Sequence, residues 1–405
     1  MKNDNGTACI LAWTSLGMNT FGRIRPCGRS KANPDLPSLS KMSIEEAWNS
    51  DFYKQLRKDM LNGVKNSNCE KCHVQEKLEG WSKRQEINEN RKFDLDKIRT
   101  QTNNDGSVDM APNHIDVRVG NICNLKCVHC WTGNSSKWYE DKILLDKYEN
   151  TKSYRINNEW ISEKGDIWDY IRKNIGSIHK LSFLGGEPFA SKEHNALLEW
   201  LHNNKEFHVE FYYVTNATLL TKNNIDKLKK FKRVTLGISL DAIGEVAEFL
   251  RFPMKWKSVE KMFDYLNETN DNKMFEPYFN WTAYNTNIWH LPNTYRYCTE
   301  KWPNIDFRLA DWVETPKHMS IKNLPKEFKN EIINKMKSVN IYNQQFYLNL
   351  MSNEHTWEKY NKTLYNYLND LDKARATNWR KVLPEIAELW PDEDYDIGGY
   401  GSWPK

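Results

Sequence analysis

The stretch that decides the fold reads Cys123-Asn124-Leu125-Lys126-Cys127-Val128-His129-Cys130 and directly follows a β-rich run. Its spacing is C-x3-C-x2-C. Three thiolates in one short loop can bind three irons of a cubane [4Fe–4S] cluster, which leaves the fourth iron open to another molecule. A zinc ion prefers four closed ligands, and His129 is the available fourth. The loop therefore predicts a metal or cluster site at the end of a strand.

Downstream of His114 short β-rich runs alternate with helical patterns, which is typical of parallel βαβ units. The expected strands are Ile115–Val119, Lys180–Leu184, Val209–Val214, Arg233–Ser239, Phe279–Tyr284 and Ile305–Leu309. The expected helices lie near Glu193–His202, Asn224–Phe231, Ser258–Leu266 and Trp289–Lys301. About six units are too few for a closed eight-fold barrel. We expect an α/β fold built on a partial (β/α)6 TIM-like barrel, with its chemistry at the C-terminal strand ends.

The chain divides by pattern into four segments. Residues 1–98 form a small Cys-rich domain with one helix-like stretch from Ser43, which opens with a capping-box pattern completed by Glu46. Residues 99–113 are polar and broken by Gly and Pro, so we expect a linker. The core spans 114–310 and contains a long helical insertion over 132–177. Residues 311–405 form a helical C-terminal extension, with helices over 323–395.

Composition excludes several classes of protein. The 17 Trp, 19 Tyr and 16 Phe can bury large apolar areas, so a packed core is expected rather than disorder. No run of about 18 apolar residues predicts a membrane span, and the N-terminus lacks a signal-peptide pattern. We expect a cytoplasmic protein whose eight cysteines are not disulfides. A net charge of +4 is too small to indicate nucleic-acid binding, which is not expected.

The remaining cysteines form a second group and one isolated residue. Cys9, Cys27, Cys69 and Cys72 precede the core, and four thiolates fully ligate either a cluster or a zinc ion. Such a site is closed to direct binding of a substrate. Cys298 stands alone in an aromatic-rich helical pattern, so we expect a buried core thiol.

Polar motifs follow successive strands. Gly185-Gly186-Glu187-Pro188 comes after the second strand, where glycine lets the main chain approach a ligand and Glu187 complements an ammonium group. Asn216 follows the third strand, and Ser239 and Asp241 end the fourth. Arg251 comes twelve residues after Ser239, and a guanidinium group can pair with a carboxylate in bidentate fashion. Singly, these residues have plain alternatives as turns, strand-end caps or a surface ion pair. Together and in order, they indicate one site.

With these motifs in sequence, residues 114–310 resemble the radical SAM superfamily. The resemblance implies that Cys123, Cys127 and Cys130 hold a [4Fe–4S] cluster, with His129 at the family's aromatic position. It further implies that Gly185, Gly186 and Glu187 bind the amino group of S-adenosylmethionine, and that Asn216, Ser239, Asp241 and Arg251 contact the rest of that cofactor. One departure is Ala217, which replaces the glycine of the family's T-N-G pattern.

The N-terminal region is similar to SPASM and twitch domains, which hold an auxiliary [4Fe–4S] cluster. The similarity rests on the four cysteines and on the stretches Glu46-Ala47-Trp48-Asn49-Ser50 and Leu56-Arg57 between them. In those families the domain usually follows the barrel, whereas here it precedes it. A structural zinc site is the alternative for these four thiolates.

The resemblance implies a radical SAM enzyme, an oxidoreductase that cleaves S-adenosylmethionine reductively to a 5′-deoxyadenosyl radical, which abstracts hydrogen from a substrate. A peptide or protein is the first choice of substrate, a small metabolite or sugar the second, and RNA the third because the basic excess is small. An electron donor such as flavodoxin or ferredoxin is an expected partner. The rival hypothesis is a non-catalytic, zinc-stabilised binding protein, which gives no reason for the motifs at successive strand ends.

Overall fold

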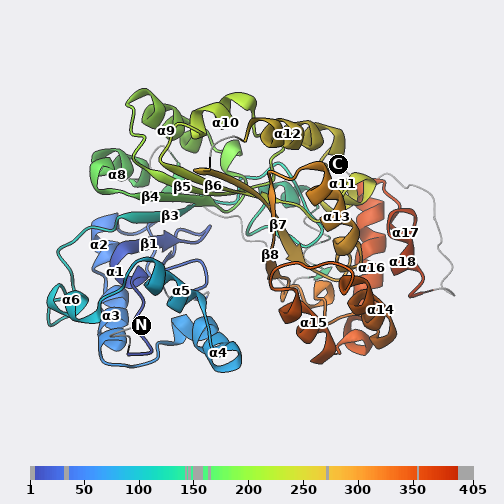
Figure 1. Cartoon of the computed structure of the whole chain (residues 1–405), viewed down its shortest axis with the longest axis horizontal. Helices are drawn as coiled ribbons and strands as arrows, with labels where there is room; N and C mark the ends of the chain where they lie inside the picture. The colour runs from blue at the N-terminus through green and yellow to red at the C-terminus, as the bar shows by residue number, and fades with distance from the viewer. Residues whose placement is uncertain are drawn as a thin grey trace. The chain divides into compact units, whose positions relative to one another are not determined.

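The computed structural model describes residues 5–31, 36–141, 144, 147–148, 158–162, 166–270, 273–353 and 355–390. Its strands form one sheet in the order β2-β1-β3-β4-β5-β6-β7-β8 (Figure 1). β2 is antiparallel to β1, and every other pair with a recorded register is parallel. Helices separate the consecutive parallel strands. The predicted α/β class and partial-barrel core are confirmed.

The elements alternate along the core as the sequence indicates. The strands are β1 (Ser15–Met18), β2 (Ile24–Arg25), β3 (His114–Arg118), β4 (Lys180–Leu184), β5 (Glu210–Thr215), β6 (Arg233–Ser239), β7 (Phe275–Ala283) and β8 (Asp306–Trp312). The helices before and within the core are α1 (Leu11–Thr14), α2 (Ile44–Trp48), α3 (Asp51–Leu61), α4 (Glu70–Glu79), α5 (Lys83–Asn90), α6 (Leu95–Thr100), α8 (Ile167–Lys173), α9 (Lys192–Asn203), α10 (Lys222–Leu228), α11 (Gly244–Leu250), α12 (Trp256–Thr269) and α13 (Leu291–Lys301). The C-terminal helices are α14 (Lys326–Met336), α15 (Gln344–Asn353), α16 (Trp357–Arg375), α17 (Trp379–Val382) and α18 (Pro384–Ala387).

All six expected strands are present, but two more come from the Cys-rich region. Sequence patterning missed β1 because Ser15–Met18 is only four residues long, which is too short for a clear periodic signal. β2 has only two residues, which is too short for any periodic signal. The long helical insertion over 132–177 is seen only in part. Its described residues include 3-10 turns, helical positions at 144, 147 and 148, and the seven-residue helix α8; the other residues of the interval lie outside the described part of the chain.

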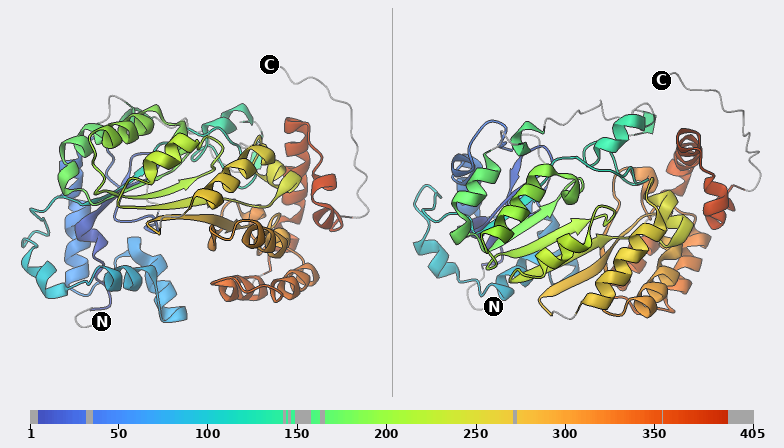
Figure 2. Two further views of the ribbon diagram at one scale, coloured as in Figure 1. Left: turned by 45° about the horizontal axis from the view of Figure 1, so that its top comes forward. Right: turned by 90° about the horizontal axis from the view of Figure 1, so that it is seen from above.

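The described chain forms two compact units, and the first contains Met1–Ile122, Arg155–Val214 and Asp226–Thr235. Burial alternates along β5, whereas Leu181–Leu184 of β4 are all buried. On one face of these strands Phe183 stacks on Trp168 of α8 and meets His194 of α9 edge-on. Figure 1 and the further views in Figure 2 show these two helices on that face. Strand alternation places Ser182 and Tyr212 on the opposite face.

The second unit contains Cys123–Tyr154, Thr215–Ile225 and Leu236–Lys405. Its core is aromatic: Phe263 of α12, Phe279 of β7 and Trp302 pack with ring centroids 5.1–5.5 Å apart. All three side chains are at most 1% exposed. Burial of each such ring contributes roughly 2–3 kcal/mol of transfer free energy, which fixes β7 and its helices as a rigid support.

Residues 99–113, expected to be a linker, are held against α2 and α3. Val108 is 2% exposed, and its carbonyl accepts a hydrogen bond from Asn49 Nδ2. Trp48 Nε1 donates to the carbonyl of Met110 at 2.7 Å, and Arg57 Nη1 donates to Gly106. The polar composition of this segment therefore reflects hydrogen bonding to the Cys-rich region. The predicted capping box is present at Ser43.

Candidate functional site

The three-cysteine loop belongs to the second unit and is fixed by main-chain hydrogen bonds. The Lys126 amide donates to the carbonyl of Phe252 at 2.7 Å, and the Val128 amide donates to Leu250 at 2.9 Å. Cys127 is 7% exposed, whereas Cys123 and Cys130 are half-buried. The loop therefore runs alongside the end of α11, which carries the predicted residue Arg251.

Two N–H groups point at the sulfur of Cys123. The Leu125 amide lies 3.5 Å from Cys123 Sγ, and Asn216 Nδ2 lies 3.9 Å from it. Asn216 also donates to Asn124 Oδ1 at 3.0 Å. Hydrogen bonds to the sulfurs of bound cysteines tune the potential of an iron–sulfur cluster. The structure thus brings the predicted Asn216 to the loop.

A buried ion pair lies beside Cys127. Arg251 Nη1 donates to Asp241 Oδ2 at 2.8 Å, and both side chains are at most 6% exposed. Burial raises the pKa of the Cys127 thiol to about 11, the charge of Arg251 lowers it, and those of Asp241 and Cys123 raise it. Burial lowers the pKa of Arg251, but Cys127 and Asp241 outweigh it, so the net pKa is raised. The pair therefore sets the charge around this cysteine.

His129 and Tyr284 complete the surroundings of the pair. Their ring centroids are 4.6 Å apart, and His129 Nδ1 lies 3.9 Å from Asp241 Oδ2. Burial lowers the pKa of His129, which keeps its ring neutral. Tyr284 is fully buried and follows β7. Sequence reasoning placed Tyr284 at a strand end without assigning it a role, although the rule that chemistry sits at such ends could have found it.

The C-terminal helix α16 reaches back to the same loop. Tyr367 Oη donates to the carbonyl of Val128 at 2.6 Å, and Arg375 Nη2 donates to that of Lys126 at 2.7 Å. The Arg375 side chain is fully buried, with its guanidinium 4.7 Å from the ring of Trp138. Nothing in the sequence signals these contacts, because the partners lie more than 200 residues apart.

The Gly-Gly-Glu motif belongs to the first unit. Its main chain is hydrogen-bonded to the segment Gly120–Ile122, which directly precedes the three-cysteine loop. The Gly186 amide donates to Gly120 at 3.0 Å, and the Glu187 amide donates to Ile122 at 2.7 Å. A Cβ on Gly186 would lie 2.1 Å from the Ile122 carbonyl oxygen, and Gly185 has φ +107°. Only glycine fits both positions. Glu187 is fully buried, and its Oε1 accepts a bond from the Phe189 amide.

Two other predicted features have simpler surroundings. Ser239 ends β6 half-buried, and its hydroxyl makes no hydrogen bond within the described residues. Ala217 adopts φ +60°, a left-handed conformation in which glycine costs less than alanine. The family's glycine at this position therefore has a conformational reason.

The N-terminal cysteines gather in the first unit. Burial raises the pKa of Cys9, and the neighbouring charges of Cys27, Cys69 and Cys72 raise it further. The pKa of Cys69 is raised to about 12 by burial and then by Cys27 and Cys72. The pKa of Cys9 therefore depends on the charges of the three other cysteines.

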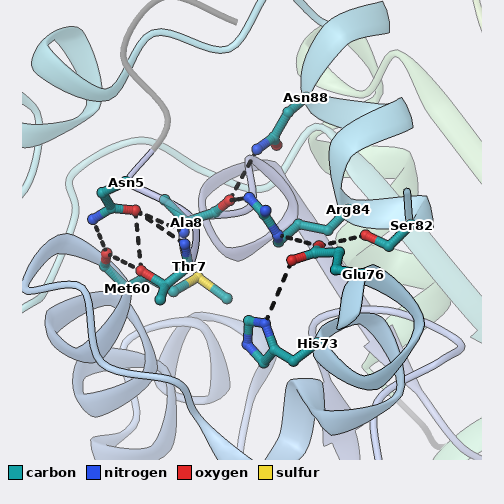
Figure 3. Close-up of polar contacts among 9 residues, drawn as sticks. All are labelled: Asn5, Thr7, Ala8, Met60, His73, Glu76, Ser82, Arg84 and Asn88. Carbon is teal, nitrogen blue, oxygen red and sulfur yellow. Dashed lines mark hydrogen bonds and ion pairs between the residues drawn. The ribbon is translucent and has the colours of Figure 1, made fainter. Parts of the chain in front are cut away.

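Helix α5 holds the main chain on both sides of Cys9. Figure 3 shows Arg84 and Asn88 at the carbonyl of Ala8. Arg84 Nη1 and Asn88 Nδ2 each donate to the carbonyl of Ala8 at 2.9 Å, and Asn88 Oδ1 accepts from the Ile10 amide at 3.0 Å. Arg84 Nε donates to Glu76 at 2.8 Å. These residues were not found from sequence, since an Arg and an Asn on a polar helix carry no signal.

The two cysteine groups fit iron–sulfur clusters. Within the described part of the chain, no three His, Cys, Asp or Glu side chains converge on a single metal ion. Cubane ligands bind different irons, so they need not converge. The N–H groups at Cys123 and the guanidinium groups of Arg251 and Arg375, whose charges act on Cys127, would offset the negative charge of such a cluster. Cys298 is 1% exposed, and burial raises its pKa.

Comparison with known families matches both parts of the chain. The model of the radical SAM superfamily matches residues 117–285, and that of an iron–sulfur cluster-binding domain, SPASM, matches residues 9–73. No described helix is both long and apolar enough to cross a membrane.

Three individual likenesses are more distant. The antilisterial bacteriocin subtilosin biosynthesis protein AlbA of Bacillus subtilis is 24% identical over 38% of this chain and 31% of its own. A GTP 3′,8-cyclase of Clostridium botulinum is 24% identical over 33% of this chain and 36% of its own. The crystal structure of Streptococcus suis SuiB bound to precursor peptide SuiA is 18% identical in sequence, with a TM-score of 0.38. The match covers 64% of this chain and 53% of SuiB. The chain spans about a third of the length of these curated relatives.

Proposed function

Because this chain belongs to the radical SAM superfamily and carries a SPASM domain at its N-terminus, we propose that it is an enzyme that modifies a peptide or protein by radical chemistry. Its cofactors are iron–sulfur clusters and S-adenosylmethionine. When bound, they supply reductive cleavage of the sulfonium and a 5′-deoxyadenosyl radical that abstracts hydrogen from the substrate. The reaction, the substrate and the site residues are part of this proposal. A cytosolic location and a flavodoxin or ferredoxin electron donor stay predictions.

The observation that carries the proposal is the environment of Cys127. A buried thiol in a three-cysteine loop lies beside the Asp241–Arg251 pair, and Arg251 Nε has no hydrogen-bond partner in the described structure. A guanidinium held by one carboxylate but with a free N–H can bind a second carboxylate. We assign this position to the methionyl carboxylate.

The chain's own residues would bind and orient the cluster and S-adenosylmethionine. Cys123, Cys127 and Cys130 would hold the cluster, and Asn216 would donate to a cluster sulfur. The main chain of Gly185–Glu187 and the Glu187 carboxylate would hold the amino group, and Asp241 keeps Arg251 ionised and in place. His129 and Tyr284 exclude water from the buried pair. The Ser239 hydroxyl, which has no hydrogen bond among the described residues, would bind the ribose.

Cys9, Cys27, Cys69 and Cys72 would hold a second cluster. Four thiolates saturate it, so it supplies electron transfer or structure instead of substrate activation. The description of the matched domain as iron–sulfur cluster-binding supports a cluster over zinc.

A peptide is favoured among substrates by the match to AlbA, whose name places it in the biosynthesis of a bacteriocin. The match to a GTP 3′,8-cyclase favours a small-molecule substrate as the second candidate. Incubation of the enzyme with GTP separates the two, because a GTP-dependent increase in 5′-deoxyadenosine would support the second and contradict the first.

Anaerobic reconstitution tests the proposed function. We expect about eight irons and eight sulfides per chain, and 5′-deoxyadenosine from S-adenosylmethionine under dithionite. Cys127→Ala should abolish this cleavage and remove about half of the iron, and Cys72→Ala should remove the other half. Cys298→Ala alters a buried thiol outside both cysteine groups and is the matched control. This variant should keep the cleavage activity and the full iron content. Stoichiometric zinc without cleavage would refute the proposal.

A further inference from the structure

The segment that carries Cys27 lies against one face of the first unit's sheet. Gly17 of β1 is in register with Arg25 of β2 on one side and with Asp116 of β3 on the other. The Cβ position of Gly17 lies 3.6 Å from Arg25 Cγ and 3.5 Å from Asp116 Cβ, so both side chains leave the sheet on the same face. The chain reaches Cys27, one of the four N-terminal thiols, two residues after Arg25.

Arg118 contacts the other end of this segment. It follows Asp116 by two residues in β3 and therefore lies on the same face. The Cβ position of Gly28, the residue after Cys27, is 2.9 Å from Arg118 Nη2 and 4.0 Å from Asp116 Oδ2. Cys27 is therefore flanked in the chain by Arg25, two residues before it, and by Gly28, which contacts Arg118.

The two guanidinium groups have few partners of their own. Arg25 Nε, Arg118 Nε and Asp116 Oδ1 are buried atoms without a hydrogen-bond partner among the described residues. Arg118 Nε lies 3.6 Å from Asp116 Oδ1, which is an ion pair but too long for a hydrogen bond. Burial and then the charge of Arg118 lower the pKa of Arg25, to about 10, whereas the charges of Asp116 and Cys27 raise it. A buried cation needs an anion beside it, and a thiolate of Cys27 is one.

The surroundings of Cys27 favour negative charge on its sulfur. Burial raises the pKa of the thiol, whereas hydrogen bonds from the main chain of Arg29 and Ser30 and the charge of Arg25 lower it. A four-thiolate cubane is anionic and becomes more so when it takes up an electron. N–H donors and cations that stabilise a thiolate therefore also stabilise the reduced state of a cluster bound to it.

We propose that Arg25 and Arg118 raise the reduction potential of the cluster on the four N-terminal cysteines (the N-terminal cluster), and that Asp116 lowers it. The three side chains act through the cluster and are positioning residues, not ligands. Reduction adds one electron to the cluster and no proton, so the fixed charges beside Cys27 act on the electron alone. This inference deepens the proposed function and rests on it, because it requires a cluster at this site.

A redox titration of the reconstituted full chain, followed by electron paramagnetic resonance, tests the proposal. Cys127→Ala, which should keep only the N-terminal cluster, assigns the signal of that cluster. Arg25→Met and Arg118→Met should each lower the equilibrium constant for its reduction about tenfold, which is about 59 mV for one electron. Asp116→Asn removes a negative charge from the same group and should raise the potential. Arg25→Lys and Arg118→Lys keep the charge and should shift the potential less than the Met variants.

The matched control is Arg99→Met, which removes an exposed arginine of the same unit and should leave the potential unchanged. A general disturbance of the fold would move Arg25→Met and Asp116→Asn in the same direction, whereas charge moves them in opposite directions. Shifts of the same sign, or wild-type potentials in both Met variants at full iron content, would overturn the inference alone. Zinc in place of iron in the Cys127→Ala protein would refute the proposed cluster, and the inference with it.

Discussion

Arg375 Nη2 donates a 2.7 Å hydrogen bond to the main-chain carbonyl of Lys126, in the middle of the three-cysteine loop. The guanidinium is fully buried, and its charge lowers the pKa of the Cys127 thiol, although burial of that thiol raises it more. A residue of the C-terminal extension thus fixes both the shape and the charge of the loop. The extension therefore contributes to the proposed cluster site.

Arg375→Met should shift the reduction potential of the three-cysteine cluster to more negative values. Loss of a nearby cation disfavours the more negative, reduced state of a cluster. A redox titration followed by electron paramagnetic resonance measures the shift. Tyr367→Phe is the matched variant, because it removes the other hydrogen bond to the loop without a change of charge. Equal shifts in both variants would show that loop shape, and not charge, sets the potential.

Asn88→Ala should remove the iron of the N-terminal cluster selectively. The variant loses the bonds to Ala8 and Ile10 that hold the main chain around Cys9. Each bond contributes about 1 kcal/mol, and the loss frees one of the four ligands. We expect iron to fall from about eight to about four atoms per chain. Asn90→Ala, at an exposed position of the same helix, should keep all of it.

Asp241→Asn should destabilise the fold by about 3–5 kcal/mol, because it leaves the buried Arg251 without its partner. Arg251→Met should cost a similar amount, and the double variant less than the sum of the two. Denaturant unfolding of the four proteins gives the coupling free energy. Additive effects would show that the pair does not act as a unit.

Gly186→Ala should disrupt the Gly-Gly-Glu turn, since the new Cβ would lie 2.1 Å from a main-chain oxygen that cannot rotate away. We expect a loss of about 1–3 kcal/mol, with reduced binding of S-adenosylmethionine. The matched control is Gly176→Ala, where no atom lies within 4 Å of the added Cβ. That change should stay within about 0.5 kcal/mol. Equal effects would contradict the steric argument.

The stability of the chain should fall as the pH drops from about 6.5 towards 4. Burial lowers the pKa of His194 to about 4, and that of His318 likewise, while the unfolded chain keeps a value near 6.5. Between these values the unfolded state binds protons that the folded state does not, so acid favours unfolding. Each histidine contributes up to about 3 kcal/mol. His194→Gln should flatten the acid limb of the unfolding free energy, and His179→Gln, at an exposed position, should not.

The sequence predicts the parts of this molecule whose signals are local. The cysteine spacing, the glycines at 185 and 186, and the capping box at Ser43 each depend on a few neighbouring residues. The strands β3 to β8 could be predicted because alternation or a short apolar run marks each one. β1 and β2 could not, because strands of four and two residues are too short for a periodic pattern to stand out from chance.

Residues that act across long separations are also invisible in sequence. Asn88 and Arg84 are ordinary helix residues until α5 is placed beside Cys9. In the sequence nothing distinguishes Tyr284 from the other tyrosines, of which the chain has 19 in all; only the structure shows that its ring contacts His129. The role of such a residue is set by tertiary packing, and one sequence records no trace of it.

The tie between α16 and the three-cysteine loop also orders the events of synthesis. The hydrogen-bond donor to the Lys126 carbonyl lies 249 residues further along the chain. The donor to the Val128 carbonyl lies 239 residues further along. During translation the three thiols leave the ribosome long before the helix that fixes their loop. Iron delivered early meets a loop without these two bonds, and iron delivered late meets the finished one. The loop therefore gains its full set of main-chain hydrogen bonds only after translation of α16.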